Sequence, residues 1–275
     1  MNLRGRTKHL GSAVARRIWS RAGQLVDGVA SSPKRRAFTL SSRMAVHLAG
    51  CSVIAIGVGL MLWNDFGPGP LDVMIGAVRS HAGLPLTFAV WATTGTLLLA
   101  SWALGRRPGF GNLVTILSVG PMMQLTLGAL GPLDPPDAVP AKIALHVVAT
   151  AIVGLGAGMN IFARLGAGTS ELLASSLADR IGVGETRVRM GLEATWLIAG
   201  VSLGGPFGLG TVIVGVLIGP FVARGFRTVD TAVSSARIAT RRQIEWARTS
   251  TAPIHVTAPV DITGPIPVLT ISAGD

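Results

Sequence analysis

An internal repeat constrains the fold of this chain more than any other feature. Residues 43–121 match residues 142–220 at a constant offset of 99 residues, without a gap. Most identical positions are glycines, but two polar matches are more telling: His47 matches His146, and Asp72 matches Glu171. A glycine-rich chain aligns some glycines by chance, but not in one ungapped register over such a length. The sequence therefore predicts two copies of one structural unit.

The apolar stretches within each copy are long enough to cross a bilayer. Only 13% of the 275 residues are charged, compared with about 25% in a soluble domain, and the mean hydropathy is +0.55. We predict an all-α, polytopic membrane protein whose main partner is the lipid bilayer. The six expected spans are residues 44–63, 86–104, 113–133, 143–163, 190–207 and 209–226.

The distribution of basic residues predicts how these spans are oriented. Both terminal segments are basic, and so are the connector at Arg106 and Arg107 and the stretch 164–189. The connector 131–141 carries Asp134 and Asp137 and no basic residue. Because basic connectors stay in the cytoplasm, the pattern predicts a multi-pass protein of the bacterial inner membrane, with both termini cytoplasmic.

Composition divides the chain into four parts. Residues 1–43 form a basic N-terminal segment, and both an amphipathic surface helix near residues 13–29 and a disordered tail are compatible with it. The first membrane repeat is expected at 44–133 and the second at 142–226. For the tail 227–275 we expect a basic helical stretch to about residue 246 and disorder after it.

Three spans in each copy are an odd number, so the second copy is expected to enter the membrane from the opposite face. Such inverted repeats are common in secondary transporters. A short segment follows the first span of each copy, at 70–82 and 169–181. As a helix it would cover roughly 20 Å, less than the roughly 30 Å hydrocarbon core. Spanning, re-entrant and interfacial placements all remain open.

These short segments begin with glycine-rich turns that end in an acid. Two readings of Asp72 and Glu171 are open: they stabilise helix N-termini, or they line a cavity that binds a cation or carries a proton. Glu193 joins them because it lies in an apolar run. The predicted substrate-binding or ion-binding residues are Asp72, Glu171, Glu193, Gly67, Gly69, Gly166 and Gly168.

Three further polar residues carry weaker hypotheses. Arg189 and Glu193 are four residues apart, so they share a helix face and are expected to form an ion pair. His47 and His146 occupy equivalent places in the two copies. They are either hydrogen-bonding groups that pack helices together or parts of a proton relay.

Several classes of function find no support in the sequence. The net charge of +11 suggests nucleic acid, but no aromatic platform or zinc-ligand spacing accompanies the basic residues. The single cysteine, Cys51, lies in an apolar run and cannot form an intrachain disulfide. No catalytic, metal-ligand or phosphate-loop pattern is present in the core, so we expect no enzyme activity, cofactor or metal. An oligomer is compatible with the sequence.

The acidic turns resemble those of the YczE/YyaS/YitT group of bacterial integral membrane proteins. The resemblance covers roughly residues 45–225 and rests on four motifs, which are Gly67–Asp72, Gly166–Glu171, Val188-Arg189 with Glu193, and residues 203–211 with 218–220. This chain has Glu171 where the group often carries aspartate. The resemblance implies a polytopic bacterial membrane protein and supplies no substrate.

These observations lead to two main hypotheses. The first is a permease for an unidentified small solute, with a midplane site near Asp72, Glu171 and Glu193. The second is a non-transporting adaptor or regulatory protein that acts through its cytoplasmic tails. An intramembrane enzyme is a weaker third hypothesis, because it would need a catalytic constellation.

Overall fold

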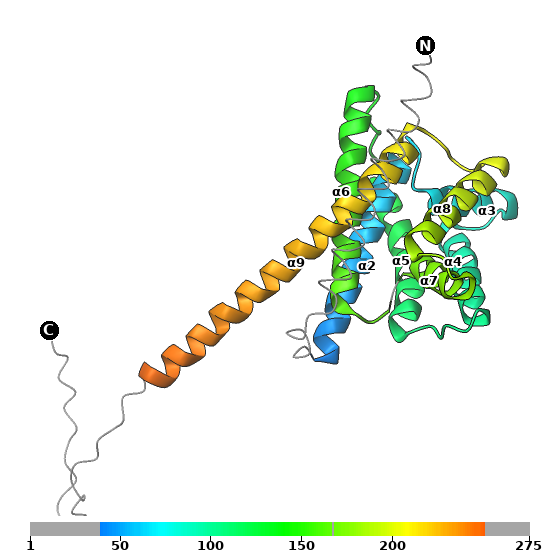
Figure 1. Cartoon of the computed structure of the whole chain (residues 1–275). Coiled ribbons are helices and arrows are strands. Elements are labelled where there is room, and N and C mark those ends of the chain that lie inside the picture. The colour runs from blue at the N-terminus through cyan, green and yellow to red at the C-terminus, as the bar shows by residue number, and fades with distance from the viewer. Residues whose placement is uncertain (1–38, 167, 251–275) are drawn as a thin grey trace, which may run out of the picture. The chain divides into compact units, whose positions relative to one another are not determined.

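The computed structural model describes residues 39–166 and 168–250, which consist of helices and the turns that join them (Figure 1). The helices are α2 (Leu40–Trp63), α3 (Pro70–Ala82), α4 (Leu86–Ala103), α5 (Phe110–Leu130), α6 (Val139–Ala163), α7 (Thr169–Ile181), α8 (Glu185–Ser202) and α9 (Leu209–Ser250). The all-α prediction is confirmed for this part of the chain. The predicted N-terminal surface helix lies outside the described residues.

Five of the described helices are long and apolar enough to cross a membrane. They are α2, α4, α5, α6 and α9 as far as Val233. The sixth expected span, 190–207, is not among them. Its helix, α8, begins earlier than expected, at Glu185, and ends at Ser202. This shift brings Glu185 and Arg187 into the helix beside Arg189 and Glu193, which lowers its hydropathy.

The repeat is visible in the helices themselves. The bounds of α7 and α8 are those of α3 and α4 moved by 99 residues, and α9 begins 99 residues after α5. All described residues with positive φ follow the same offset: Asp65 and Arg164, Gly67 and Gly166, Gly83 and Gly182, and Gly105 and Gly204. Each copy therefore contains three longer helices and one short helix, joined by the same turns.

Helices α2 and α6 occupy equivalent places in the two copies, and they pack against each other in antiparallel directions (Figure 1). A Cβ on Gly50 would lie 2.9 Å from the carbonyl oxygen of Gly156, and one on Gly57 would lie 2.9 Å from that of Ala149. Residues later in α2 thus contact residues earlier in α6, as expected of antiparallel helices. The glycines allow this close approach because they carry no side chain.

The two copies also dock on each other through their turns. The Gly210 N–H, at the start of α9, donates to the carbonyl of Phe66 in the first turn segment at 2.7 Å. Reciprocally, the Gly111 N–H at the start of α5 donates to the carbonyl of Leu165 at 3.0 Å. The short helices cross over in the same way, because α3 packs on α8 and α7 packs on α4.

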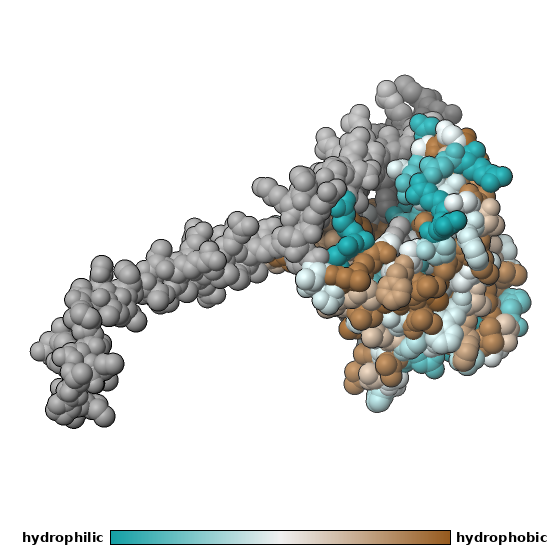
Figure 2. All heavy atoms as spheres, turned by 90° about the horizontal axis from the view of Figure 1, so that it is seen from below, coloured by the Kyte–Doolittle hydropathy of each residue, from teal (hydrophilic) through white to brown (hydrophobic). Residues whose placement is uncertain are grey.

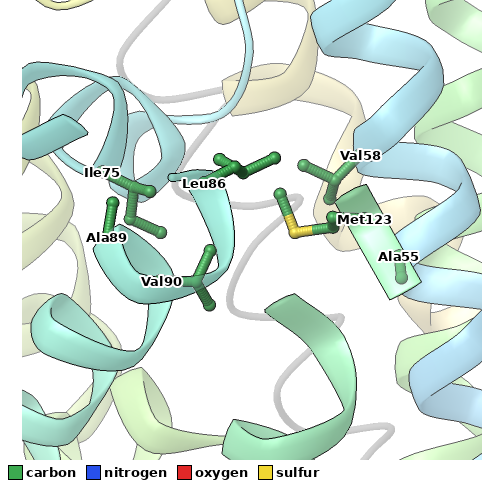
Figure 3. Packing of buried hydrophobic residues seen from close by; sticks show 7 residues of the cluster. All are labelled: Ala55, Val58, Ile75, Leu86, Ala89, Val90 and Met123. Carbon is green, nitrogen blue, oxygen red and sulfur yellow. The ribbon is translucent and has the colours of Figure 1, made fainter. Parts of the chain in front are cut away.

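The buried hydrophobic residues form several separate clusters. Figure 3 shows the cluster in which α2, α3, α4 and α5 of the first copy meet, made of Ala55, Val58, Ile75, Leu86, Ala89, Val90 and Met123. A second cluster joins the copies, with Leu97 of α4 and its counterpart Trp196 of α8 packed around Leu173.

The outer surface of the candidate spans is also apolar. Large side chains such as Leu99, Leu117 and Leu125 are more than half exposed. Figure 2 shows apolar residues over much of the coloured part of the visible face. Exposed apolar surface of this extent indicates contact with lipid rather than with water.

Helix α9 extends beyond its candidate span and ends at Ser250. The tail from residue 227 was expected to be largely disordered, with a helical stretch to about residue 246. The expected helical stretch is present and continues to Ser250, and no glycine or proline interrupts the sequence between Phe226 and Ser250. Residues 251–275 lie outside the described part.

Candidate functional site

Three charged side chains of the second copy form an ion cluster. Arg189 Nη2 lies 3.0 Å from Glu171 Oε1, and Arg189 Nε lies 3.1 Å from Glu193 Oε1. Between a quarter and a third of each side chain is exposed. The cluster holds two carboxylates against one guanidinium, so it carries a net negative charge when all three groups are ionised.

Local structure explains how these groups come together. Glu171 lies in the first turn of α7, three residues after the N-cap Gly168. The hydroxyl of Ser170 donates to Glu171 Oε2 at 3.0 Å. Burial by itself raises the pKa of Glu171, but the Arg189 guanidinium and the hydrogen bonds outweigh it, so this pKa is lowered. Glu171 is therefore ionised near neutral pH.

Asp72 occupies the equivalent position of the first copy, but its surroundings differ. The counterparts of Arg189 and Glu193 are Val90, which is buried, and Thr94, whose hydroxyl donates to the Val90 carbonyl at 2.6 Å. Among the described residues, no basic side chain lies within ion-pair distance of Asp72. Burial in α3, which is not among the candidate spans, raises the pKa of Asp72 to about 7.

The structure thus brings only part of the predicted site together. Glu171, Glu193 and Arg189 are in contact, whereas no described interaction links Asp72 to any of them. The backbone of the two copies is symmetric, but their charge is not. One copy has a paired acid at the start of its short helix, and the other has an unpaired acid with a raised pKa.

The glycines of the acidic turns serve close packing. Gly67 has φ +101°, and a Cβ on it would lie 2.5 Å from the backbone nitrogen of Gly208. A Cβ on Gly166 would lie 2.7 Å from Asn112 Oδ1, and one on Gly168 would collide with the Glu171 carboxylate. Gly69 is less crowded, because its Cβ would lie 3.3 Å from Asp72 Oδ2. Gly67, Gly166 and Gly168 thus leave no room for a side chain.

The two histidines are buried, and each lies against the start of a different long helix. His47 Nε2 is 3.0 Å from the Gly111 carbonyl and 3.0 Å from Thr115 Oγ1. His146 lies beside the backbone of Gly210, and no hydrogen bond of normal geometry reaches its ring nitrogens from the described residues.

A direct relay between the histidines is not supported. Gly50 faces Gly156, so the antiparallel register places His47 near residue 159 of α6, about 13 residues from His146. That separation is roughly 20 Å at 1.5 Å per residue. Both residues are buried at equivalent places in the two copies, and their role stays a prediction.

Polar residues that sequence reasoning overlooked help to hold the copies together. Arg43 Nε donates to the Ala163 carbonyl at 2.8 Å, and another of its nitrogens reaches the Arg164 carbonyl, which satisfies the end of α6. Asn112 Oδ1 accepts the Gly109 N–H at 2.8 Å at the start of α5. Asn160 Nδ2 lies 3.7 Å from Cys51 Sγ. A lone Asn within an apolar run was the available signal for Asn112 and Asn160.

Comparisons with known proteins agree with the helical membrane architecture. Residues 41–226 match a protein family that is described as a family of unknown function, DUF6198. An uncharacterized membrane protein of Bacillus subtilis, YczE, is 28% identical over 181 residues, which cover 64% of this chain and 82% of that protein. An uncharacterized protein of Haemophilus influenzae is 25% identical over 179 residues, or 65% of this chain and 81% of that protein.

No solved structure matches the chain. The family match covers most of the described membrane part, and the similarity to YczE confirms the resemblance inferred from the acidic turns. The chain therefore belongs to the DUF6198 family, a family of unknown function.

Proposed function

We propose that this protein is a permease of the bacterial inner membrane that moves a small cationic solute or couples transport to protons. The ion cluster of Glu171, Arg189 and Glu193, with its unpaired counterpart Asp72, carries the proposal. The two carboxylates that share one guanidinium in the cluster, and the separate acid Asp72 in the other copy, favour a cation. Acidic side chains in the membrane region of a protein carry a large desolvation cost, and they mark ion or substrate pathways.

The proposed topology has six spans in two inverted repeats, with α8 as the sixth span. Helix α8 occupies the place in its copy that α4 occupies in the other, and α4 meets the length and hydropathy expected of a span. The antiparallel packing of α2 and α6 supports the inversion, because equivalent helices of inverted copies cross the membrane in opposite directions. In this arrangement α3 and α7 are short helices that do not span.

Charge supports cytoplasmic termini. Arg43 at the start of α2 contacts the end of α6, so these helix ends lie at one face, and Arg164 follows there. At the opposite ends of α2 and α5, the connectors carry Asp65 and Asp134. The basic face is the cytoplasmic face under the positive-inside rule.

Transport through this site requires a change of access from one face to the other. The reciprocal docking of the turns at Gly67 and Gly166 gives each copy one rigid contact with the other. Rocking about the α2–α6 pair would open one side of the interface while closing the other. Protonation of Asp72 near neutral pH would couple such a movement to a proton gradient.

The test uses the purified full-length protein in liposomes that enclose a pH-sensitive dye. A panel of cationic and zwitterionic solutes (amino acids, polyamines and quaternary amines) is added with and without a proton gradient. We expect at least one solute to produce protein-dependent proton movement or uptake. Asp72→Asn and Glu171→Gln should each lower that flux about tenfold or more while the protein still inserts.

Asp137→Asn is the matched control, because this acid is exposed on the connector between α5 and α6. Its flux should equal that of the wild type. Equal flux for Asp72→Asn, Glu171→Gln, Asp137→Asn and the wild type would show that Asp72 and Glu171 take no part in transport. No flux for any solute of the panel, with protein correctly inserted, would favour the adaptor.

One observation favours that adaptor as a second candidate. Helix α9 continues past its candidate span to Ser250, in a segment with Arg237, Arg241 and Arg242. A basic helix after a span can bind an acidic partner or an anionic leaflet. Charge removal at these arginines would then abolish binding to that partner or leaflet, while Asp72→Asn would leave it unchanged.

A further inference from the structure

A basic pocket lies at the end of α4, apart from the acidic residues of the proposed transport site. It has a volume of about 500 Å³. It is lined by the turn that follows α4 and by the second half of α7, through Leu104, Gly105, Arg106, Arg107, Ser176, Asp179 and Arg180. Its size is in the range of pockets that take small ligands.

The charges around this pocket are unbalanced. Arg106 binds Asp179 through two nitrogens, with Nη2 at 2.6 Å and Nε at 3.1 Å from the same carboxylate oxygen. Among the described residues, no carboxylate lies within ion-pair distance of Arg107 or Arg180. Two guanidinium groups at the pocket are thus available for an anion, and Arg106 is held in place beside them.

The repeat shows that the fold does not need these charges. The counterparts of Arg107 and Arg180 in the other copy are Pro206 and His81. The Pro206 ring packs directly on α3, since a Cβ on Gly76 would lie 2.5 Å from its Cδ. The same backbone turn, with Gly105 at φ +99° and Gly204 at +72°, therefore forms with and without arginines.

The position of the pocket points to the membrane surface. Trp102 and Phe110, on either side of the turn, are 59% and 64% exposed. Exposed aromatic residues at the ends of spans are typical of the lipid–water interface. Basic pockets between helices at the cytoplasmic interface bind the phosphate of anionic lipid headgroups.

We propose that Arg107 and Arg180 bind a phosphate group in this pocket, either the phosphate of an anionic phospholipid or free inorganic phosphate. Guanidinium groups suit this ligand because their planar forks donate two parallel hydrogen bonds to phosphate oxygens. The Arg106–Asp179 ion pair joins the two sides of the pocket and is neutral, so Arg107 and Arg180 leave a net positive charge there.

The positive-inside rule offers a competing explanation, since it places arginine in cytoplasmic connectors whether or not they bind anything. Lysine separates the two explanations, because it keeps the charge and loses the fork geometry. Arg187→Gln is the matched control, because Arg187 is exposed at the start of α8 and does not line the pocket.

The experiment measures lipid and phosphate binding to the purified full-length protein. Native mass spectrometry counts the phosphatidylglycerol and phosphatidylcholine molecules that remain bound. In parallel, thermal unfolding is followed with added inorganic phosphate or chloride. The variants are Arg107→Gln with Arg180→Gln, Arg107→Lys with Arg180→Lys, and Arg187→Gln. Monodisperse elution of each variant confirms that it is folded.

We expect the wild type to retain phosphatidylglycerol in preference to phosphatidylcholine. The double glutamine variant should lose this preference by about tenfold, as expected for two ion pairs made by exposed arginines. The double lysine variant should fall between the two, and Arg187→Gln should match the wild type. If phosphate stabilises the wild type alone and no lipid preference appears, the ligand is free phosphate.

Two outcomes would overturn the proposal. In the first, the double glutamine variant binds lipid and phosphate as well as the wild type does. In the second, Arg187→Gln loses the lipid preference as well, or the double lysine variant keeps the full preference of the wild type, so that binding follows total charge alone. Binding would then be a property of the basic face and not of this pocket.

Discussion

Arg189 Nη2 lies 3.0 Å from Glu171 Oε1, and this ion pair joins the first turn of α7 to α8. The same guanidinium binds Glu193, which is one turn further along α8. A single arginine thus neutralises part of the charge of two carboxylates in different helices. The other copy has Val90 at the equivalent position and forms no such link.

Removal of this arginine should destabilise the protein. In Arg189→Gln, two half-buried carboxylates face each other without a cation, so we expect the free energy of unfolding to fall by roughly 1–3 kcal/mol. Thermal unfolding in detergent measures the change. Adding Glu171→Gln to Arg189→Gln should restore part of the loss, because it removes one of the unpaired charges. Additive losses in the double variant would show that Glu171 and Arg189 are not coupled.

Asp72 should make stability depend on pH. Its pKa is raised from 3.8 to about 7 by burial, so the folded protein holds this proton more tightly than the unfolded chain does. The resulting stabilisation is fully present below about pH 4 and is lost as the pH rises through about 7. The melting temperature of the wild type, measured relative to Asp72→Asn, should therefore fall by a few degrees between about pH 5 and pH 8. A constant difference across this range would contradict the raised pKa.

Gly67 should not tolerate a side chain. Its φ of +101° is unfavourable for alanine, and the added Cβ would lie 2.5 Å from the backbone of Gly208. We expect Gly67→Ala to lower stability by about 2–4 kcal/mol and to reduce the folded yield. Gly95→Ala is the control, because no atom lies within 4 Å of a Cβ there and the residue is helical. It should be neutral or slightly stabilising, as measured by thermal unfolding.

Inverted copies should place the ends of the two short helices on opposite faces of the membrane. In a Cys51→Ser background, single cysteines replace Ala82 at the end of α3 and Ile181 at the end of α7, which are both exposed. A membrane-impermeant thiol reagent should label Ala82→Cys in intact cells and Ile181→Cys only after the cells are opened. Labelling of both positions from the same side would mean that the copies run parallel and would rule out the proposed topology.

Much of the architecture could be predicted because it depends on local sequence. The offset that pairs His47 with His146 also predicted equal helices and equal turns in the two copies. Glycines at 67, 83 and 105 recur 99 residues later, and their positive φ angles recur with them. Hydropathy was less reliable for α8. The charged residues in the first half of α8 lower the average hydropathy there, so hydropathy does not show clearly where this helix begins.

The sequence by itself therefore determined the helices, the duplication, the apolar surface and the pairing of Arg189 with Glu193, which lie one helical turn apart. Only the tertiary structure decided that Glu171 shares that arginine, that Asp72 has no cationic partner in the described part of the chain, and that the two histidines lie far apart. It also decided that Arg107 and Arg180 meet at one pocket. These relations join residues from separate helices, and they depend on how the two copies dock, for which periodicity and composition carry no information.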